Sequence, residues 1–164
     1  MLSLCFLVKF IMTIRSLKER DLRSLKELFC SYYEELGCDD DPLPLFTDCV
    51  APDWRANLLS IAVAEEGEKL CGFIIFQIDD VINDWCFAEG KGDIREIYVG
   101  RSERRKGLGK ALLLFAENAL KNTGAKEVYL LPTDESEGFF ISCGYKDIGD
   151  YCAELDCKVF GKDL

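Results

Sequence analysis

The chain has 164 residues, of which 49% are hydrophobic and few are glycine or proline, so it fits one globular domain and is not a disordered or low-complexity protein. Its formal net charge is −10 at pH 7, and it has no basic stripe with interleaved aromatic residues, which argues against a nucleic-acid partner. It contains no histidine, which excludes histidine-based nucleophilic catalysis.

The nine cysteines are scattered and odd in number, and none of them forms a Cys-x-x-Cys pair. No spacing supports a metal site, because an all-cysteine or carboxylate zinc site would need such clustering. We interpret most of these residues as buried thiols in a reducing compartment and expect a cytoplasmic protein without a metal.

Residues 1–11 form an apolar extension in front of the expected domain, residues 12–164. The extension lacks the charged start and the small-residue cleavage site of a secretory signal, and it is too short to span a membrane. We therefore expect no membrane partner. Its apolar side chains need a partner, either as an extra strand or as a subunit contact in a homodimer.

A short first strand is predicted at residues 13–16. Residues 19–36 carry apolar side chains at helical spacing, and Gly37 is placed to end that helix. The proline- and aspartate-rich stretch 38–44 cannot be a helix or an inner strand. A short second helix is predicted at 52–58, with a proline near its start.

Two β-rich runs, 59–64 and 70–78, are joined through residues 65–69, where Gly67 supplies a hairpin turn. After a mixed linker come a strand at 93–99, a helix and a further strand. Such a β–α–β unit requires its two strands to run parallel, whereas the hairpin is antiparallel. The elements of this second half are a helix at 108–122, a strand at 126–131, a helix at 134–143 and strands at 145–148 and 152–160. The order predicts an α/β domain whose mixed sheet carries helices on both faces.

Half of the ten residues from 101 to 110 are basic, although the chain as a whole is acidic. They lie between a predicted strand and a predicted helix, where unpaired amides and the helix dipole favour an anion. Gly107 and Gly109 lack the Cβ atoms that would hinder a phosphate near the backbone. The basic side chains that would add charge-assisted bonds are Arg104, Arg105 and Lys110. This pattern predicts either a pyrophosphate site or a plain basic turn that caps a helix, and the surrounding sequence decides between them.

Two familiar phosphate loops do not match this stretch. A Walker loop fails because Ala111 stands where serine or threonine is required, and a dinucleotide loop fails because Leu112 replaces its third glycine. The remaining pattern, Arg104-x-x-Gly107-x-Gly109, resembles the Gln/Arg-x-x-Gly-x-Gly/Ala loop of the GNAT superfamily of N-acetyltransferases.

The resemblance extends over residues 12–160. Its further landmarks are Ile14-Arg15 with Asp21 and Leu22, Cys71-Gly72-Phe73, Ile94-Arg95-Glu96-Ile97-Tyr98-Val99 and Phe139-Phe140-Ile141-Ser142-Cys143-Gly144-Tyr145. It implies a single-domain GNAT-like αβα sandwich with a mixed, mostly antiparallel sheet and a parallel splayed strand pair at the cofactor site. It also implies acetyl-CoA as co-substrate.

The same resemblance implies which residues hold the cofactor. The main chain of Ile97, Tyr98 and Val99 would pair with the pantetheine amides. The pyrophosphate would lie on the loop Arg104, Arg105, Lys106, Gly107, Leu108, Gly109 and Lys110. Phe139 and Phe140 would flank the thiol end.

Direct transfer of an acetyl group to an amine needs a base, and only carboxylates are available. Glu96 is favoured over Asp93, although their spacing puts them on opposite faces of a regular strand; a bulge would change that. Many members of the family carry a tyrosine general acid where this chain has Phe140. Tyr145 is a nearby substitute, and so are Ser142 and Tyr98, but none matches the family pattern.

Two aspartate-rich loops, 39–41 and 79–84, border the acceptor cleft in the family. They either attract a cationic amine or are solvated loop charges. The predicted function is acetyl-CoA-dependent N-acetylation of a small, cationic amine. The alternative is a CoA-binding or regulatory module of the same fold with weak catalysis.

Overall fold

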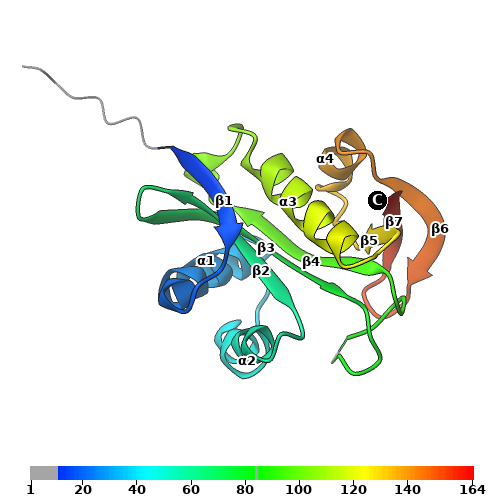
Figure 1. Cartoon of the computed structure of the whole chain (residues 1–164), viewed down its shortest axis with the longest axis horizontal. Helices are drawn as coiled ribbons and strands as arrows, with labels where there is room; N and C mark the ends of the chain where they lie inside the picture. Colours follow the sequence, from blue (N-terminus) through cyan, green and yellow to red (C-terminus); the bar gives the residue numbers. More distant parts are fainter. Residues whose placement is uncertain (1–10, 84) are drawn as a thin grey trace, which may run out of the picture.

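A computed structural model of the chain describes residues 11–83 and 85–164. Seven strands form one sheet in the order β1-β2-β3-β4-β5-β7-β6 (Figure 1). All neighbours are antiparallel except β4 and β5. The strands are β1 (Met12–Ser16), β2 (Ser60–Glu66), β3 (Lys69–Ile78), β4 (Gly92–Val99), β5 (Glu127–Leu130), β6 (Lys146–Cys152) and β7 (Cys157–Asp163).

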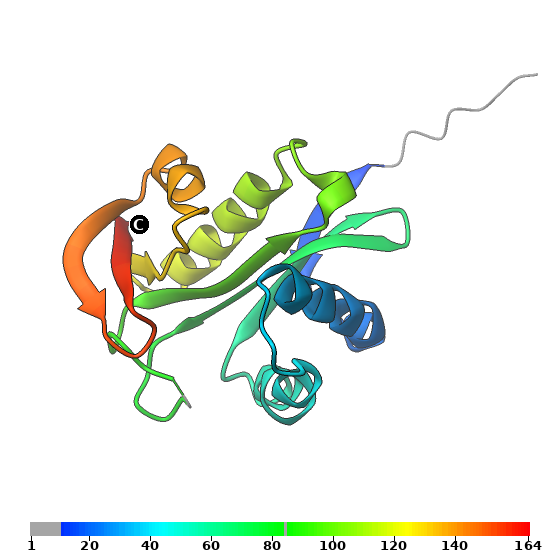
Figure 2. The same cartoon turned by 180° about the vertical axis from the view of Figure 1, so that it is seen from behind.

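Helices cover both faces of this sheet. The elements α1 and α2 lie on one face, and α3 and α4 lie on the other, as the reverse view also shows (Figure 2). The helical elements are η1 (Glu19–Asp21), α1 (Leu22–Glu35), the π-helical turn η2 (Leu45–Val50), α2 (Ala51–Arg55), η3 (Arg101–Glu103), α3 (Leu108–Asn122) and α4 (Glu137–Ser142). The predicted single-domain αβα sandwich is confirmed.

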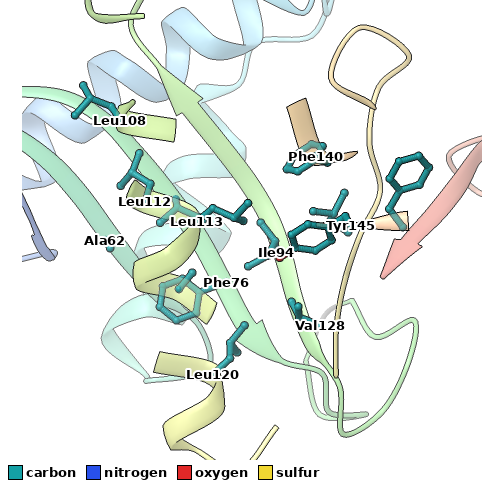
Figure 3. Packing of buried hydrophobic residues seen from close by; sticks show 14 of the residues in the cluster. Ala62, Phe76, Ile94, Leu108, Leu112, Leu113, Leu120, Val128, Phe140 and Tyr145 are labelled. Atoms are coloured by element: carbon teal, nitrogen blue, oxygen red, sulfur yellow. The ribbon is translucent and has the colours of Figure 1, made fainter. Parts of the chain in front are cut away.

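The alternation of side chains along β3 creates two hydrophobic cores. Phe73 and Ile75 point to the core under α1, whereas Ile74 and Phe76 point to the core under α3. Leu112 of α3 is fully buried against this second core (Figure 3). Because both faces of β3 are buried, its sequence is a continuous apolar run rather than an alternating one.

The parallel pair β4–β5 is short. Gly92 to Ile94 pair with Val128 to Leu130, and β4 then continues to Val99 without β5, which ends before Pro132. The predicted parallel, splayed pair is therefore confirmed. Among the described residues, the divergence leaves the second half of β4 without a neighbouring strand on that side.

Two predicted elements were wrong in position. The closing strands turn at residues 153–156, where Asp156 has a φ of +52°, and not near Gly149. Gly149 has a φ of +83° and lies inside β6, at a register shift against β7, so it forms a bulge rather than a turn. The helix predicted at 52–58 is preceded by η2, because a wide π-helical turn leads directly into α2.

The predicted boundary after residue 11 lies at the edge of the described chain. Residues 1–10 of the apolar extension lie outside the described residues, and Ile11 is 81% exposed. Strand β1 starts at Met12 and pairs with β2. Among the residues that the structure describes, no helix has both the length and the apolar character needed to cross a membrane.

Candidate functional site

The loop before α3 presents a row of unpaired backbone amides. Gly107 has a φ of +80° and occupies the N-cap, and the first bond of the helix runs from the Ala111 amide to the Gly107 carbonyl at 3.0 Å. The amides of residues 105–110 have no hydrogen-bond partner within 11–83 and 85–164. Such a nest at a helix N-terminus suits the oxygens of a phosphate group.

This loop opens into a groove of about 650 Å³. The groove runs between the free edge of β4, the N-terminus of α3 and the α4 segment. It brings together eleven of the twelve residues that the sequence assigns to the cofactor: Ile97, Tyr98, Val99, Arg104, Arg105, Gly107, Leu108, Gly109, Lys110, Phe139 and Phe140. Lys106 is the exception, because it does not line the groove.

Lys106 instead pairs with Glu103, a residue that sequence reasoning missed. The buried Glu103 carboxylate accepts hydrogen bonds from Lys106 at 2.6 Å and from Lys69 at 2.9 Å. These bonds lower the pKa of Glu103 to about 2, so it stays ionised and fixes the loop to the β2–β3 hairpin. The Glu103 carboxylate also lies near the Glu66 carboxylate and the Cys71 thiol, a grouping that could hold a metal ion. Its charge is already neutralised by Lys69 and Lys106.

Arg104 lies along the groove wall rather than in the nest. Its Nε donates to the Val99 carbonyl at 2.9 Å, and its Nη2 donates to Glu35 at 2.6 Å. Glu35, at the end of α1, also accepts from the Tyr98 hydroxyl at 2.6 Å and pairs with Arg101 at 3.1 Å. Glu35 therefore connects α1 to the loop before α3, and no sequence motif predicts this role.

The two loop glycines serve different purposes. At Gly107 the positive φ is the constraint, since a Cβ there would meet nothing within 4 Å. At Gly109 the constraint is space, because a Cβ would lie 3.2 Å from Cζ of Phe139. The sequence explained Gly109 by the access that it gives phosphate to the backbone. The structure adds a second reason, because α3 contacts the ring of Phe139 at this position.

A bulge in β4 changes the face of the sheet on which the side chains of the candidate bases, Asp93 and Glu96, lie. Glu96 pairs with Ile75 and Ile94 pairs with Phe76, so Arg95 is the extra residue on β4. The bulge puts Asp93 and Glu96 on the same face of the sheet, the face covered by α1. Their opposite orientation in a regular strand does not apply here.

Glu96 is held by two tyrosines of α1. The Tyr32 hydroxyl donates to its Oε2 at 2.5 Å, and the Tyr33 hydroxyl donates to its Oε1 at 3.0 Å. Burial raises the pKa of Glu96, while the two tyrosine bonds and the charge of Arg95 oppose the rise. A carboxylate whose pKa is raised is a better proton acceptor than an ordinary one.

Glu96 also separates two smaller cavities. One, of about 110 Å³, lies next to the groove where β4 and β5 diverge, and we call it the inner cavity. The other, of about 150 Å³, lies under α1 and η2, and we call it the side cavity. Glu96 lines both of them, and Tyr32 lines both the groove and the inner cavity.

Asp93, the second predicted base, is in a different environment. It is 3% exposed, lines none of these three cavities, and its Oδ2 has no partner among the described residues. Burial and the charge of Asp79 raise its pKa to about 8. Asp79 is itself buried and accepts from the Tyr129 hydroxyl at 2.6 Å and from the Phe87 and Ala88 amides. Asp79 therefore organises the loop before β4.

Tyr145 lies in the core and not at the groove. It is 2% exposed, its hydroxyl donates to Glu117 at 3.0 Å, and its ring packs near Phe140 (Figure 3). Its position does not support the predicted catalytic role. The aspartates 39–41 are exposed and do not line the side cavity, whose carboxylates are Asp53 and Glu96.

Solved structures share this fold. The PaiA N-acetyltransferase of Thermoplasma acidophilum in complex with coenzyme A superimposes with a TM-score of 0.73 at 20% identity, over 94% of this chain and 99% of that one. A predicted acetyltransferase of Clostridium acetobutylicum with acetyl-CoA gives 0.74 at 19% identity, over 87% and 94%. The aminoglycoside N-acetyltransferase AAC(6')-Iy in complex with CoA gives 0.68 at 18% identity, over 84% and 90%.

At these identities the likeness establishes the fold alone. The sequence itself matches the model of the acetyltransferase (GNAT) family over residues 22–145, which includes α1, the bulged strand β4, the amide nest and α4. The chain belongs to the acetyltransferase (GNAT) family.

Proposed function

We propose that the protein transfers the acetyl group of acetyl-CoA directly to the amine of a small acceptor. One observation carries the proposal: the free amides of residues 105–110 open into a groove that leads along β4 to Glu96. The nest suits the diphosphate of the donor, and the carboxylate suits the amine. The two halves of the reaction thus have a place in neighbouring cavities that share lining residues.

Different residues of the groove would bind different parts of acetyl-CoA. The amides 105–110 would take the diphosphate, with Arg105 and Lys110 adding charge. The exposed edge of β4 would pair with the pantetheine amides as an added strand does. For that, Arg104 has to release the Val99 carbonyl, which it binds at 2.9 Å. Phe139 and Phe140 would pack against the thiol end.

Glu96 would act as the base. An amine with a pKa of about 10 must lose a proton before it attacks, which costs roughly 4 kcal/mol at pH 7. A positioned base contributes about 10²–10⁴-fold, and holding both reactants together contributes several kcal/mol more. The hydrogen bonds of Tyr32 and Tyr33 fix both oxygens of Glu96, so its orientation is set before a substrate arrives.

The side cavity suits a small acceptor. Its volume of about 150 Å³ leaves room for a few heavy atoms, and Trp85 gives it an aromatic wall. Its charged lining consists of the carboxylates of Asp53 and Glu96 and the guanidinium of Arg95, so one negative charge is in excess there and favours a cationic amine. The exposed aspartates 39–41 do not line this cavity, and Asp84 of the second aspartate-rich loop lies outside the described residues.

The experiment is a CoA-release assay over a panel of small amines, with the wild type and Glu96→Gln. We expect turnover with at least one amine, and a loss of about 10²–10⁴-fold in kcat for Glu96→Gln. Acetyl-CoA affinity, measured by calorimetry, should stay the same because Glu96 does not line the groove. Equal turnover by the two proteins would remove Glu96 from the mechanism.

Phe140 favours a second candidate function. Its ring lines the groove and brings no hydroxyl to the place where many members of the family carry a tyrosine acid. A CoA-binding or regulatory module would keep the groove and lose efficient transfer. Tight acetyl-CoA binding without turnover on any amine would identify that module.

We also place the protein in a reducing compartment, the cytoplasm. Within the described residues, eight cysteines are free thiols, but only two of them, Cys71 and Cys152, are buried, so the interpretation of most cysteines as buried thiols is wrong. Such thiols persist where disulfides do not form.

A further inference from the structure

Direct transfer leaves one proton without a donor: the one that the sulfur of CoA needs when the thioester breaks. Among the described residues, several hydroxyls near the groove donate to groups other than Glu96, the proposed base, and so have no direct route to the amine proton. Tyr98 donates to Glu35 at 2.6 Å, and Ser136 donates to the Thr133 carbonyl at 2.9 Å. Tyr145 donates to Glu117 in the core.

Tyr32 occupies the position that the missing donor requires. It lines both the groove and the inner cavity, as Phe140 does from α4. Its hydroxyl lies 2.5 Å from Glu96 Oε2, and Glu96 in turn lines the inner cavity and the side cavity. Two side chains in direct contact therefore connect the thiol end of the groove with the acceptor.

We propose that Tyr32 is the catalytic acid of this transferase, and that it passes to the sulfur the proton that Glu96 removes from the amine. The inference rests on the proposed function. The amine nitrogen forms a bond to the acetyl carbon, the C–S bond breaks, and its electron pair goes to sulfur. Glu96 takes the amine proton, Tyr32 gives its hydroxyl proton to sulfur, and Glu96 returns a proton to Tyr32. The second proton that the cationic amine loses goes to solvent, so the products are the amide, CoA thiol and one released proton, and both side chains regain their starting states.

The charge of Glu96 controls when Tyr32 can donate. Burial and the neighbouring Glu96 carboxylate raise the pKa of Tyr32, so it holds its proton while Glu96 is ionised. When Glu96 carries the proton from the amine, that charge is gone and the tyrosine becomes more acidic. Proton removal at one end thus favours donation at the other.

Tyr33 provides a matched control inside the chain. It is the next residue of α1, it also donates to Glu96, and it lines the side cavity but neither the groove nor the inner cavity. We expect Tyr32→Phe to lower kcat by about 10²-fold or more, as for the loss of an acid. Tyr33→Phe, which removes only one bond to Glu96, should lower it by about 10-fold or less.

A binding measurement tests the contact with sulfur without turnover. The affinities of CoA and desulfo-CoA are compared by calorimetry in the wild type, Tyr32→Phe and Tyr33→Phe. The wild type and Tyr33→Phe should prefer CoA, and Tyr32→Phe should lose about 3- to 10-fold of that preference, the value of one hydrogen bond. Thermal unfolding of each variant confirms that it is folded.

The outcomes separate this inference from the proposed function. A wild type that acetylates no amine contradicts the proposed function. An active wild type in which Tyr32→Phe and Tyr33→Phe lose equal activity overturns the role of Tyr32. So does a wild type that binds CoA and desulfo-CoA equally well, a result that requires no variant to fold.

Discussion

The carboxyl group of Asp93 makes the stability of the protein depend on pH in an unusual direction. Its pKa is raised to about 8, so between about pH 4 and 8 the folded protein keeps a proton that the unfolded chain releases. The free energy of unfolding should therefore fall as pH rises through this interval, by up to about 1.4 kcal/mol per pH unit. Urea unfolding at a series of pH values measures this slope.

The variant Asp93→Asn isolates the contribution, because its amide does not titrate. Its stability relative to the wild type should increase steadily from pH 5 to pH 8 and then level off. A constant difference across that range would show that Asp93 is ionised in the folded protein. Below pH 4 the change of stability with pH is set by groups such as Glu103. Because the pKa of Glu103 is lowered, its ionisation increases the free energy of unfolding as pH rises.

Gly107 tests the amide nest. Gly107→Glu introduces a side chain at a φ of +80° and a negative charge at the proposed diphosphate site. We expect it to abolish acetyl-CoA binding in calorimetry while circular dichroism shows an intact fold. Gly90→Glu is the control, because Gly90 has a φ of +81°, has nothing within 4 Å of its Cβ position and does not line the groove. Undiminished binding by Gly107→Glu would contradict the assignment.

At the residue scale, motifs and long-range pairs were not equally predictable. The loop glycines and basic residues follow one another in the sequence, so their pattern could be found. Glu35 contacts residues more than sixty positions away, and Tyr32 meets Glu96 across a similar distance. Such contacts exist only after α1 has packed on β4, and an isolated glutamate or tyrosine on a helix carries no signal of them.

Among the elements, β3 leaves no room for a side chain at Gly72, where it faces β4. A Cβ there would lie 2.6 Å from the Tyr98 carbonyl oxygen, a backbone atom that cannot move without shifting β4. We expect Gly72→Ala to lower the free energy of unfolding by about 1–3 kcal/mol in urea titrations, as other overpacked sites do.

Gly161→Ala is the comparison at a similar distance. Its Cβ would lie 2.9 Å from Cγ2 of Ile148, which is the end of a movable side chain on β6. The loss of stability should be clearly smaller than for Gly72→Ala. Equal losses would mean that β4 yields as easily as a side chain does.

Element types were more predictable than their ends and irregularities. The apolar pattern of α3 and its glycine stop gave the same bounds as the structure, 108–122. The bulge at Arg95 has no glycine to mark it, and two adjacent polar residues do not say which of them is the extra one, so the pairing with β3 is needed to locate it. Gly149 shows the reverse case, since a bulge glycine and a turn glycine look identical until the strands pair.

For the whole molecule, the alternation of predicted strands and helices was sufficient to derive the sandwich. A run that is apolar on both sides, such as β3, requires two covering layers, and the crossover after β4 requires a parallel neighbour. The strand order was not derivable in the same way, because β7 inserts between β5 and β6 by long-range pairing.

Ligand binding should stabilise the whole molecule measurably. Acetyl-CoA at about 100 times its Kd adds about 2.7 kcal/mol to the free energy of unfolding. For a domain of this size that corresponds to a rise in Tm of about 5–10 °C. A scan with and without acetyl-CoA measures the shift, and ATP at the same concentration serves as the anionic control. A shift of equal size with ATP would mean that the site recognises phosphate charge alone.

The cluster of Arg101, Arg104 and the Tyr98 hydroxyl around Glu35 has a consequence for the order of events in catalysis. A donor that draws the arginines toward its phosphates loosens their hold on Glu35, which shares one helical turn with Tyr32. Binding of the donor would thereby shift α1, the helix whose tyrosines hold Glu96, before the amine binds. We expect a sequential kinetic scheme in which the thioester enters before the amine and free CoA departs last.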